Sequence, residues 1–288
     1  MVVSSVSEMD RINQTVWQHD AGLFAIEGWS DPGELEAFMF VADLARGGPI
    51  LDLGVGGGRT ASLLRLLSAQ YVAIDYTPAM VDLCRRRHPG LDVRHGDARD
   101  LDGIADASQQ LVLFSVNGID AVDHDGRQQV LAAVRRVLRP GGLFLFSTLN
   151  KDGALFGAHP GSAPALEWEP GSLLPRRPDA PMRPVAAPDT GAAAPTGDDG
   201  EEAPPEWAIA VDNWRRLRRQ TVDSGDWGVA PFAAHHFALL THFITMAGER
   251  AELDRHGMDV EAVFSCDGEL VTGQASTAMY LHFVARRR

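Results

Sequence analysis

The chain has 288 residues, 45% of them hydrophobic, and a formal net charge of -13. This length fits one large globular domain, with or without an insertion. The negative charge argues against a nucleic-acid surface, and no apolar run approaches the roughly 18 residues of a membrane span. The first residues lack the basic and apolar parts of an export signal, and two cysteines are too few for a disulfide framework. We therefore expect a cytoplasmic protein that binds neither nucleic acid nor membrane.

The first well-marked helix is expected to begin after Asp31. Asp31 can cap it, Pro32 suits its first turn, and Glu34 stands three residues after the cap. The helical spacing predicts a buried face made of Leu35, Phe38, Met39 and Ala42. The glycines and proline at 47–49 should end this helix and lead into a strand.

Strands and helices then alternate. We predict strands at about 50–54, 71–75, 91–95, 110–116 and 141–149, and helices at about 59–68, 78–87 and from about 126. Strands such as YVAID and LVLFSV are apolar on both faces, which is typical of a parallel sheet covered by helices on both sides.

The composition changes near residue 155. Residues 158–206 are rich in Pro, Ala, Gly and acidic residues and are predicted to be largely disordered. A basic helix in WAIAVDNWRRLRRQ, a longer helix from His235 to Gly257, and two strands in VEAVFS and AMYLHFVA should follow. We divide the chain into cap helices (1–46), a nucleotide-binding core (47–154), an insertion with a lid helix (155–230) and the closing elements of the core (231–288).

The stretch ILDLGVGGGRT places four glycines between a strand and a helix. Such a loop exposes bare backbone at the carboxyl edge of the sheet, where open α/β sheets bind ligands. Gly56, Gly58 and Ala61 also satisfy the loose dinucleotide pattern. The loop alone therefore does not separate nicotinamide or flavin cofactors from other nucleosides.

Acidic residues at two further strand ends help to distinguish between these cofactors. Asp75 closes YVAID, and its carboxylate suits the paired hydroxyl donors of a ribose. Asp97 follows the third strand and can accept from an exocyclic amine of a base, while the backbone N–H of Ala98 pairs with a ring nitrogen. No lysine or arginine is clearly placed for phosphates, so the pattern indicates an adenosine without phosphate.

These residues resemble the class I S-adenosylmethionine-dependent methyltransferases. LDLGVGGG, AIDYTPAMV, GDARDL, LVLFSVNGID and LRPGGLFLFST are similar to five motifs of that family, in order, over about 50–148. The resemblance implies a Rossmann-like α/β fold: a doubly wound, seven-stranded, mostly parallel sheet with an antiparallel last strand. It also implies S-adenosylmethionine as cofactor and S-adenosylhomocysteine as product.

The resemblance further implies which residues hold the cofactor. The glycine loop would admit the methionine part, Asp75 would bind the ribose, and Asp97 with Ala98 would face the adenine. Asp52 would lie under the loop, steering its amides and opposing the cofactor's positive charge. The implied cofactor-binding set is Asp52, Gly54, Gly56, Gly58, Asp75, Tyr76, Met80, Asp97, Ala98 and Ser115.

The acceptor site is indicated less directly. Asn117 and Asp120 follow the fourth strand, while Asp123 or Asp125 is better explained as a helix cap. His235 and His242 would share one face of the predicted helix. Polar residues satisfied at a helix start are the simplest interpretation of them, a single histidine base comes next, and metal ligands come last. Trp17, His19, Trp29 and Asn150 are candidate substrate contacts. We predict methyl transfer to nitrogen, oxygen or sulfur of a small metabolite, without a metal.

Two other functions remain open from the sequence. A nicotinamide-dependent oxidoreductase is favoured by the glycine pattern but opposed by Asp97 and the closing strands. A non-catalytic member of the fold, which binds a nucleoside or acts as a scaffold, is also compatible, because a fold does not determine chemistry.

Overall fold

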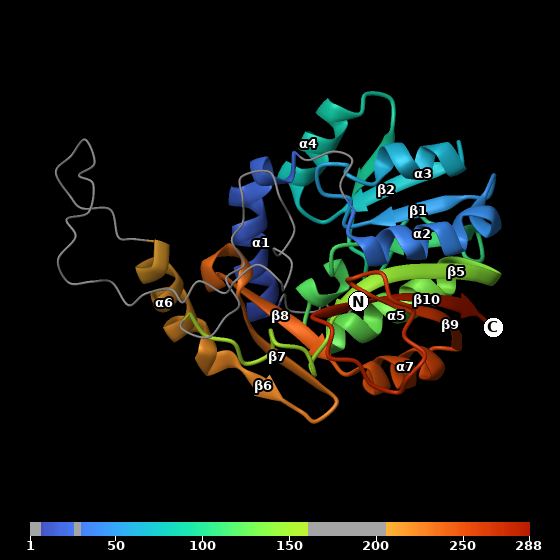
Figure 1. Cartoon of the computed structure of the whole chain (residues 1–288). Helices are drawn as coiled ribbons and strands as arrows, with labels where there is room; N and C mark the ends of the chain where they lie inside the picture. Colours follow the sequence, from blue (N-terminus) through green and yellow to red (C-terminus); the bar gives the residue numbers. More distant parts are fainter. Residues whose placement is uncertain (1–6, 26–29, 161–205) are drawn as a thin grey trace, which may run out of the picture.

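The computed structural model describes residues 7–25, 30–160 and 206–288 (Figure 1). Its main sheet has seven strands in the order β3-β2-β1-β4-β5-β10-β9. Their bounds are β1 (Ile50–Leu53), β2 (Tyr71–Asp75), β3 (Asp92–His95), β4 (Gln109–Phe114), β5 (Leu138–Leu149), β9 (Met258–Ser265) and β10 (Tyr280–Arg287).

The strands from β3 to β5 pair in parallel, whereas β10 is antiparallel to both of its neighbours, β5 and β9. The predicted seven-stranded, mostly parallel sheet with an antiparallel last strand is therefore confirmed. Because the carboxyl ends of β1, β2 and β4 lie at one edge, the loops that follow them converge there.

Helices cover both faces of this sheet (Figure 1). Buried side chains of α2 (Pro32–Ala45), α3 (Ala61–Leu67) and α4 (Pro78–Arg87) pack on one face. Those of α5 (His124–Val137) and α7 (Met246–Arg255) pack on the other. Strand β1 sends side chains to both faces of the sheet. Ile50 packs in the core on the side of α2, α3 and α4, whereas Leu51 and Leu53 pack in the core on the side of α5 and α7.

Helix α2 begins as predicted but buries a different face. The Asp31 side chain accepts a hydrogen bond from the backbone N–H of Glu34. However, Leu35 and Met39 are 48% and 73% exposed, whereas Ala37 and Val41 are buried. The predicted buried face was wrong at these positions because apolar residues occur around the whole helix, so periodicity alone did not identify the side that meets the sheet.

A second, three-stranded antiparallel sheet follows α6 (Glu206–Leu217) and η3 (Arg218–Gln220). Its strands are β6 (Val222–Asp223), β7 (Trp227–Phe232) and β8 (Leu239–Ile244), in the order β6-β7-β8. The basic helix is confirmed by α6. The insertion predicted at 158–206 falls mainly on residues 161–205, which lie outside the described residues.

The predicted long helix from His235 to Gly257 was wrong in its first half. The chain instead forms the short turn η4 (Ala234–Phe237), then β8, and only α7 is helical. Thr245 caps α7 by accepting from the backbone N–H of Gly248. A short apolar run such as that of β8 fits a buried strand as well as a buried helix, so its periodicity was ambiguous.

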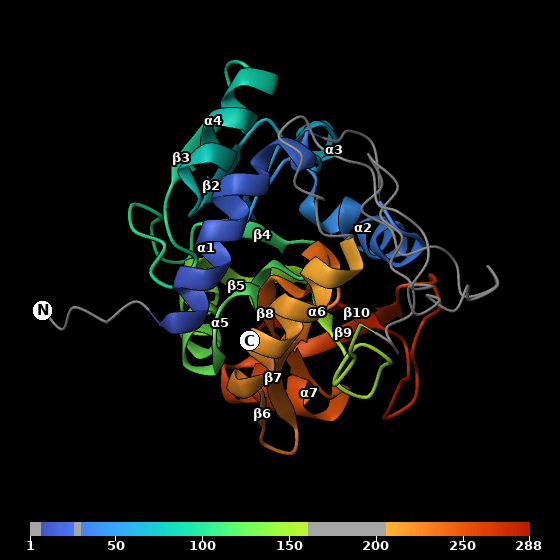
Figure 2. The same cartoon turned by 90° about the vertical axis from the view of Figure 1, so that its left-hand side faces the viewer.

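Helix α1 (Glu8–Asp20) is followed by the turn η1 (Ala21–Phe24). Helix α1 contacts both α4, which covers the main sheet, and β8 of the second sheet (Figure 2). Asn13 is fully buried and donates to the carbonyls of Ala121 and Leu240, while its Oδ1 accepts from the Leu240 N–H. These bonds fix α1 against β8 and against the turn η2 (Gly118–Ala121). No helix in the described ranges is long and apolar enough to cross a membrane.

Candidate active site

A pocket, here called the strand-end pocket, lies at the carboxyl ends of β1, β2 and β4. All but two of the residues predicted to bind cofactor line it: Gly54, Gly56, Asp75, Tyr76, Met80, Asp97, Ala98 and Ser115. They come from four loops, which meet because the strands are parallel neighbours. The two exceptions are Asp52 and Gly58.

The glycine loop passes close to the floor of the strand-end pocket. Gly54 has φ of +59°, and a Cβ added to it would lie 2.7 Å from the Phe114 ring. The backbone N–H of Gly56 donates to Asp75 Oδ2 at 2.9 Å, and that of Thr77 donates to Asp75 Oδ1 at 2.8 Å. Asp75 is thereby held at the pocket wall, and burial raises the pKa of its carboxyl. A carboxylate oxygen can accept more than one hydrogen bond, so Asp75 can also accept from the hydroxyls of a ribose.

Asp52 does not steer the loop amides. Its Oδ2 accepts from the hydroxyls of Thr60 and Tyr71, both at 2.7 Å, on the face covered by α3. Burial raises its pKa to about 6. Gly58 also lies behind the pocket, where a Cβ would come within 2.5 Å of the His88 ring. Asp52 and Gly58 therefore hold the loop against α3 and α4 and do not line the pocket.

Asp97 is held by an ion pair that the sequence did not indicate. Arg99 donates to both of its carboxylate oxygens, at 2.6 Å for the shortest contact, and also donates to Asp10 Oδ2 of α1 at 2.5 Å. Arg99 thus connects the third strand end to α1. Asp97 keeps its place in the pocket wall with its orientation fixed.

Arg59 is a further pocket residue. It lies buried, pairs with Glu34 of α2 through two bonds of 2.6 and 2.7 Å, and donates to Ser115 Oγ at 3.1 Å. Ser115 is therefore positioned at the pocket wall by a guanidinium. The Arg59–Glu34 pair joins residues 25 positions apart, so the linear sequence gave no signal for it.

A second pocket, here called the adjoining pocket, lies between η2, the end of β5, the start of β10 and the second sheet. Five residues line both pockets: Trp17, Phe24, Val116, Gly118 and Ala121. Trp17 stands four residues after Asn13 and so lies on the same side of α1. Apolar side chains make most of the walls, including Leu149, Leu155, Phe232 and Leu239.

His235 lines the adjoining pocket and forms a dyad with Asp20. His235 Nδ1 lies 2.7 Å from Asp20 Oδ2, and the ring is stacked on Phe24 and set edge-on to Trp17. Removal from water lowers the pKa of His235, although Asp20 opposes the shift. The imidazole is therefore neutral at neutral pH, and the Asp20 contact orients it. Asp20 was not among the predicted site residues.

Asn117 lines the adjoining pocket beside the wall that the two pockets share. It and Val116 have φ of 54° and 50°, a left-handed backbone that asparagine tolerates but that is strained for the β-branched Val116. The Asn117 N–H donates to Ser147 Oγ at 2.7 Å. Its Oδ1 is buried and has no hydrogen-bond partner among the described residues. An unpaired buried amide oxygen at a pocket wall is suited to accept from a ligand.

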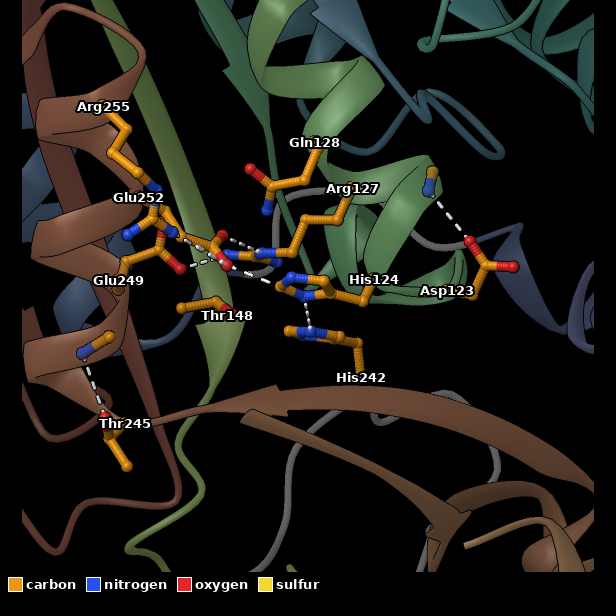
Figure 3. Close-up of polar contacts among 12 residues, drawn as sticks. Asp123, His124, Arg127, Gln128, Thr148, His242, Thr245, Glu249, Glu252 and Arg255 are labelled. Carbon is orange, nitrogen blue, oxygen red and sulfur yellow. Dashed lines mark hydrogen bonds and ion pairs between the residues drawn. The ribbon is translucent and has the colours of Figure 1, made fainter. Parts of the chain in front are cut away.

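Asp120 and His242, both predicted as catalytic, lie instead in a buried ionic network around Arg127. Figure 3 shows the part of this network that contains His242, His124 and Arg127. Asp120 accepts from Arg127 at 2.7 Å, from Thr148 Oγ1 at 2.8 Å and from the Leu149 N–H at 2.6 Å. His242 contacts His124, Nε2 to Nδ1, at 3.2 Å. Neither residue lines either pocket. The assignment of His242 failed because β8 is a strand, so the helical spacing to His235 does not apply.

Of the predicted substrate contacts, one lines the pockets, two lie elsewhere and one is outside the described residues. Trp17 lines both pockets. The His19 side chain is 88% exposed and contacts Asp20, and Asn150 is buried with its Nδ2 donating to the carbonyls of Ser276 and Ala278. Trp29 lies outside the described residues. Within the described ranges, no three His, Cys, Asp or Glu side chains are grouped to hold a metal ion.

The strand-end pocket fits an adenosine with an uncharged or cationic tail. It presents two carboxylates as acceptors and a loop of glycines for close approach. The Tyr76 hydroxyl is buried in this region without a partner among the described residues, and burial raises its pKa, so it remains a donor. The arginine that lines the pocket already pairs with Glu34, so no cation is devoted to phosphate.

Comparison with known proteins decides between the nucleoside cofactors. Residues 50–142 match the sequence model of a methyltransferase domain. Residues 50–142 therefore form a methyltransferase domain. This match and the curated relatives agree with the predicted family and with S-adenosylmethionine as its cofactor.

Curated relatives agree with this assignment over part of their length. A probable S-adenosylmethionine-dependent methyltransferase of Mycolicibacterium smegmatis is 35% identical over 115 residues, which are 40% of this chain and 43% of the relative. A phthiotriol/phenolphthiotriol dimycocerosates methyltransferase of Mycobacterium tuberculosis is 40% identical over 108 residues, 36% of this chain and 38% of the relative. The match therefore spans less than half of these curated relatives.

The fold is shared more widely than the sequence. A methyltransferase of Mesorhizobium loti superposes with a TM-score of 0.53 at 18% identity, covering 88% of this chain and 98% of that chain. The 1,6-didemethyltoxoflavin-N1-methyltransferase of Burkholderia thailandensis, solved with its substrate and S-adenosylhomocysteine, gives 0.55 at 15% identity and covers 100% and 92%. At such identities the likeness shows the fold alone.

Proposed function

We propose that the chain transfers a methyl group from S-adenosylmethionine to a small, largely apolar acceptor molecule bound in the adjoining pocket. The observation that carries this proposal is the shared wall of the two pockets. Trp17, Phe24, Val116, Gly118 and Ala121 line both, so a cofactor in one and an acceptor in the other would meet there. The apolar walls also exclude water from the site. Exclusion of water and close positioning of the two reactants both favour displacement at a methyl carbon.

The residues would divide the work as follows. The carboxylates of Asp75 and Asp97 and the glycine loop hold the cofactor, which supplies an electrophilic methyl group on a sulfonium. The Asn117 amide oxygen accepts a hydrogen bond from the acceptor and orients it. His235, kept neutral by burial and held by Asp20, removes the proton that a hydroxyl or amine loses as it forms the new bond. A nitrogen or oxygen nucleophile uses this base, whereas a thioether would not need it.

The acceptor class is supported by the pocket walls and by one group of relatives. Relatives named phthiotriol/phenolphthiotriol dimycocerosates methyltransferases take lipid substrates by their names, and the B. thailandensis neighbour was solved with a small heterocycle. Both kinds of molecule offer an apolar body and a polar nucleophile. The walls of the adjoining pocket, Leu149, Leu155, Phe232 and Leu239 among them, match such a body.

The test uses two adjacent histidines with the same backbone geometry. His235 and His236 have φ of 51° and 52°, and asparagine tolerates this region, so His235→Asn and His236→Asn impose matched changes. Purified protein is screened with methyl-labelled S-adenosylmethionine against apolar alcohols, phenols and amines. We expect His235→Asn to lower kcat by about 100-fold or more on the accepted compound, with cofactor affinity unchanged. His236, which is exposed, should tolerate the change.

The pH profile gives a second readout. The pKa of His235 in the folded protein is lower than its ordinary value near 6.5. The imidazole is therefore neutral at and above pH 6.5. It becomes protonated, and stops acting as a base, only when the pH falls through the lowered pKa. We expect kcat/KM of the wild type to be level near neutral pH and to fall on the acid side below about 6.5. This acid limb should disappear in His235→Asn. Equal turnover of wild type and His235→Asn would show that the base assignment is wrong.

A further inference from the structure

The adjoining pocket has a polar corner, made by the start of α2 and the first residues of β10. Asp31 and Tyr280 line the pocket there, and His282 lies two residues further along the strand. The Tyr280 hydroxyl donates to Asp31 Oδ2 at 3.3 Å, which is long for a hydroxyl donor. His282 Nε2 lies 2.9 Å from Asp31 Oδ1, which also accepts from the Glu34 N–H at 2.8 Å. Oδ2 is thus the less satisfied oxygen.

The Asp31 carboxyl is ionised at neutral pH although it is buried. Burial raises its pKa, but the contacts with His282, the Glu34 N–H and Tyr280 outweigh burial and leave the pKa below its ordinary value. Only 6% of its side chain is exposed. Arg59, which interacts with Asp31 electrostatically, makes its ion pair with Glu34. A carboxylate in apolar surroundings with one weakly bonded oxygen favours a cationic donor.

Two other polar atoms of the adjoining pocket lack hydrogen-bond partners in the part of the chain that the structure describes. Asn117 Oδ1 and Thr241 Oγ1 are buried without partners among the described residues. An amide oxygen accepts only, and a hydroxyl oxygen can accept. Because the pocket offers acceptors in an otherwise apolar wall, a complementary ligand brings several N–H or O–H donors on an apolar body.

We propose, resting on the methyl-transfer function above, that the acceptor molecule carries an amino group that binds as an ammonium to the Asp31 carboxylate. The Oδ2 atom receives one N–H bond, and the Tyr280 hydroxyl oxygen is placed to accept a second. An ammonium has no lone pair, so this group anchors the acceptor and is not the atom that receives the methyl group. Asp31 is therefore a specificity-determining residue of the adjoining pocket.

The test compares two probes that share one apolar body. Protein saturated with S-adenosylhomocysteine is titrated with 2-phenylethylamine and with 2-phenylethanol, which differ in an ammonium against a neutral hydroxyl. We expect the amine to bind the wild type about tenfold or more tightly, since hydrogen bonds to charged groups are the stronger ones. In Asp31→Asn this preference should vanish. Asparagine caps a helix as well as aspartate does, so α2 keeps its start.

The matched control is Asp123→Asn. Asp123 caps α5 by accepting from the Gly126 N–H and lines neither pocket, so the same substitution there must leave the amine preference intact. Equal binding of amine and alcohol to the wild type, or a preference that survives in Asp31→Asn, would overturn the amine proposal while the S-adenosylhomocysteine titration still supports the methyltransferase function. Absence of S-adenosylhomocysteine binding to the wild type would contradict that function and this proposal with it.

Discussion

Individual residues at the strand ends were predictable because open parallel sheets bind ligands at the carboxyl ends of their strands. The carboxyl ends of β1, β2 and β4 lie side by side, so Gly54, Asp75 and Ser115 meet in one pocket although they are far apart in the chain. The residues that orient two other pocket side chains, His235 and Asp97, were not predictable. Asp20 and Arg99 act through contacts that cross the fold, to His235 and to Asp10, and no local pattern announces such pairs.

Asp75 offers the sharpest test at this scale. Asp75→Asn keeps the size of the side chain but removes its charge and replaces one acceptor oxygen with a donor facing a backbone N–H of Gly56 or Thr77. We expect the Kd for S-adenosylhomocysteine to rise about tenfold to 100-fold in calorimetric titration. Asp82→Asn, an exposed position of α4, is the control. An unchanged Kd in Asp75→Asn would remove Asp75 from the cofactor site.

At the scale of elements, strong alternation of strands and helices predicted the core, while the region after β5 was only partly predictable. Helix α6 follows from its own amphipathic pattern. Strand β8 does not, because its six residues are all buried, so apolar and polar residues do not alternate between an inner and an outer face. The error carried over to function, since two histidines placed on one helix face belong to a turn and a strand.

The network around Arg127 joins these elements and carries a prediction. Arg127 of α5 contacts Glu249 and Glu252 of α7 (Figure 3). It also contacts Asp120 of η2, and all four residues are buried. Three buried carboxyls face one guanidinium, so the charges do not balance. Burial raises the pKa of Asp120 to about 7 and that of Glu249 to about 8.

Glu249→Gln should therefore change how stability depends on pH. The folded pKa of Glu249 lies above its ordinary value of 4.5, so the folded protein holds a proton that the unfolded chain releases between about pH 4.5 and 8. Stability from this group falls as pH rises through that window. In thermal unfolding, the Tm of Glu249→Gln minus the Tm of the wild type should increase from pH 5 to pH 8. Glu261→Gln, in a surface pair with Arg286, is the control, and a constant difference between Glu249→Gln and wild type would contradict the shift.

At the scale of the whole molecule, the two pockets depend on contacts between distant parts of the chain. Asn13 and Leu240 are 227 positions apart, yet their hydrogen bonds place Trp17 in the wall that the pockets share. The sequence predicted the cofactor side because its motifs are local and ordered along one sheet. It did not predict the shape of the acceptor side, because α1, the second sheet and β10 contribute one wall each.

The most direct test of the central claim is a calorimetric titration of the purified chain with S-adenosylmethionine, S-adenosylhomocysteine and NADH, side by side. The strand-end pocket predicts micromolar binding of the first two and no heat from NADH, because Asp75 and Asp97 suit an adenosine and the one arginine in the wall is paired with Glu34. Binding of NADH alone would contradict the assignment and favour a dehydrogenase, and silence from all three ligands would favour a member of the fold that binds no nucleoside.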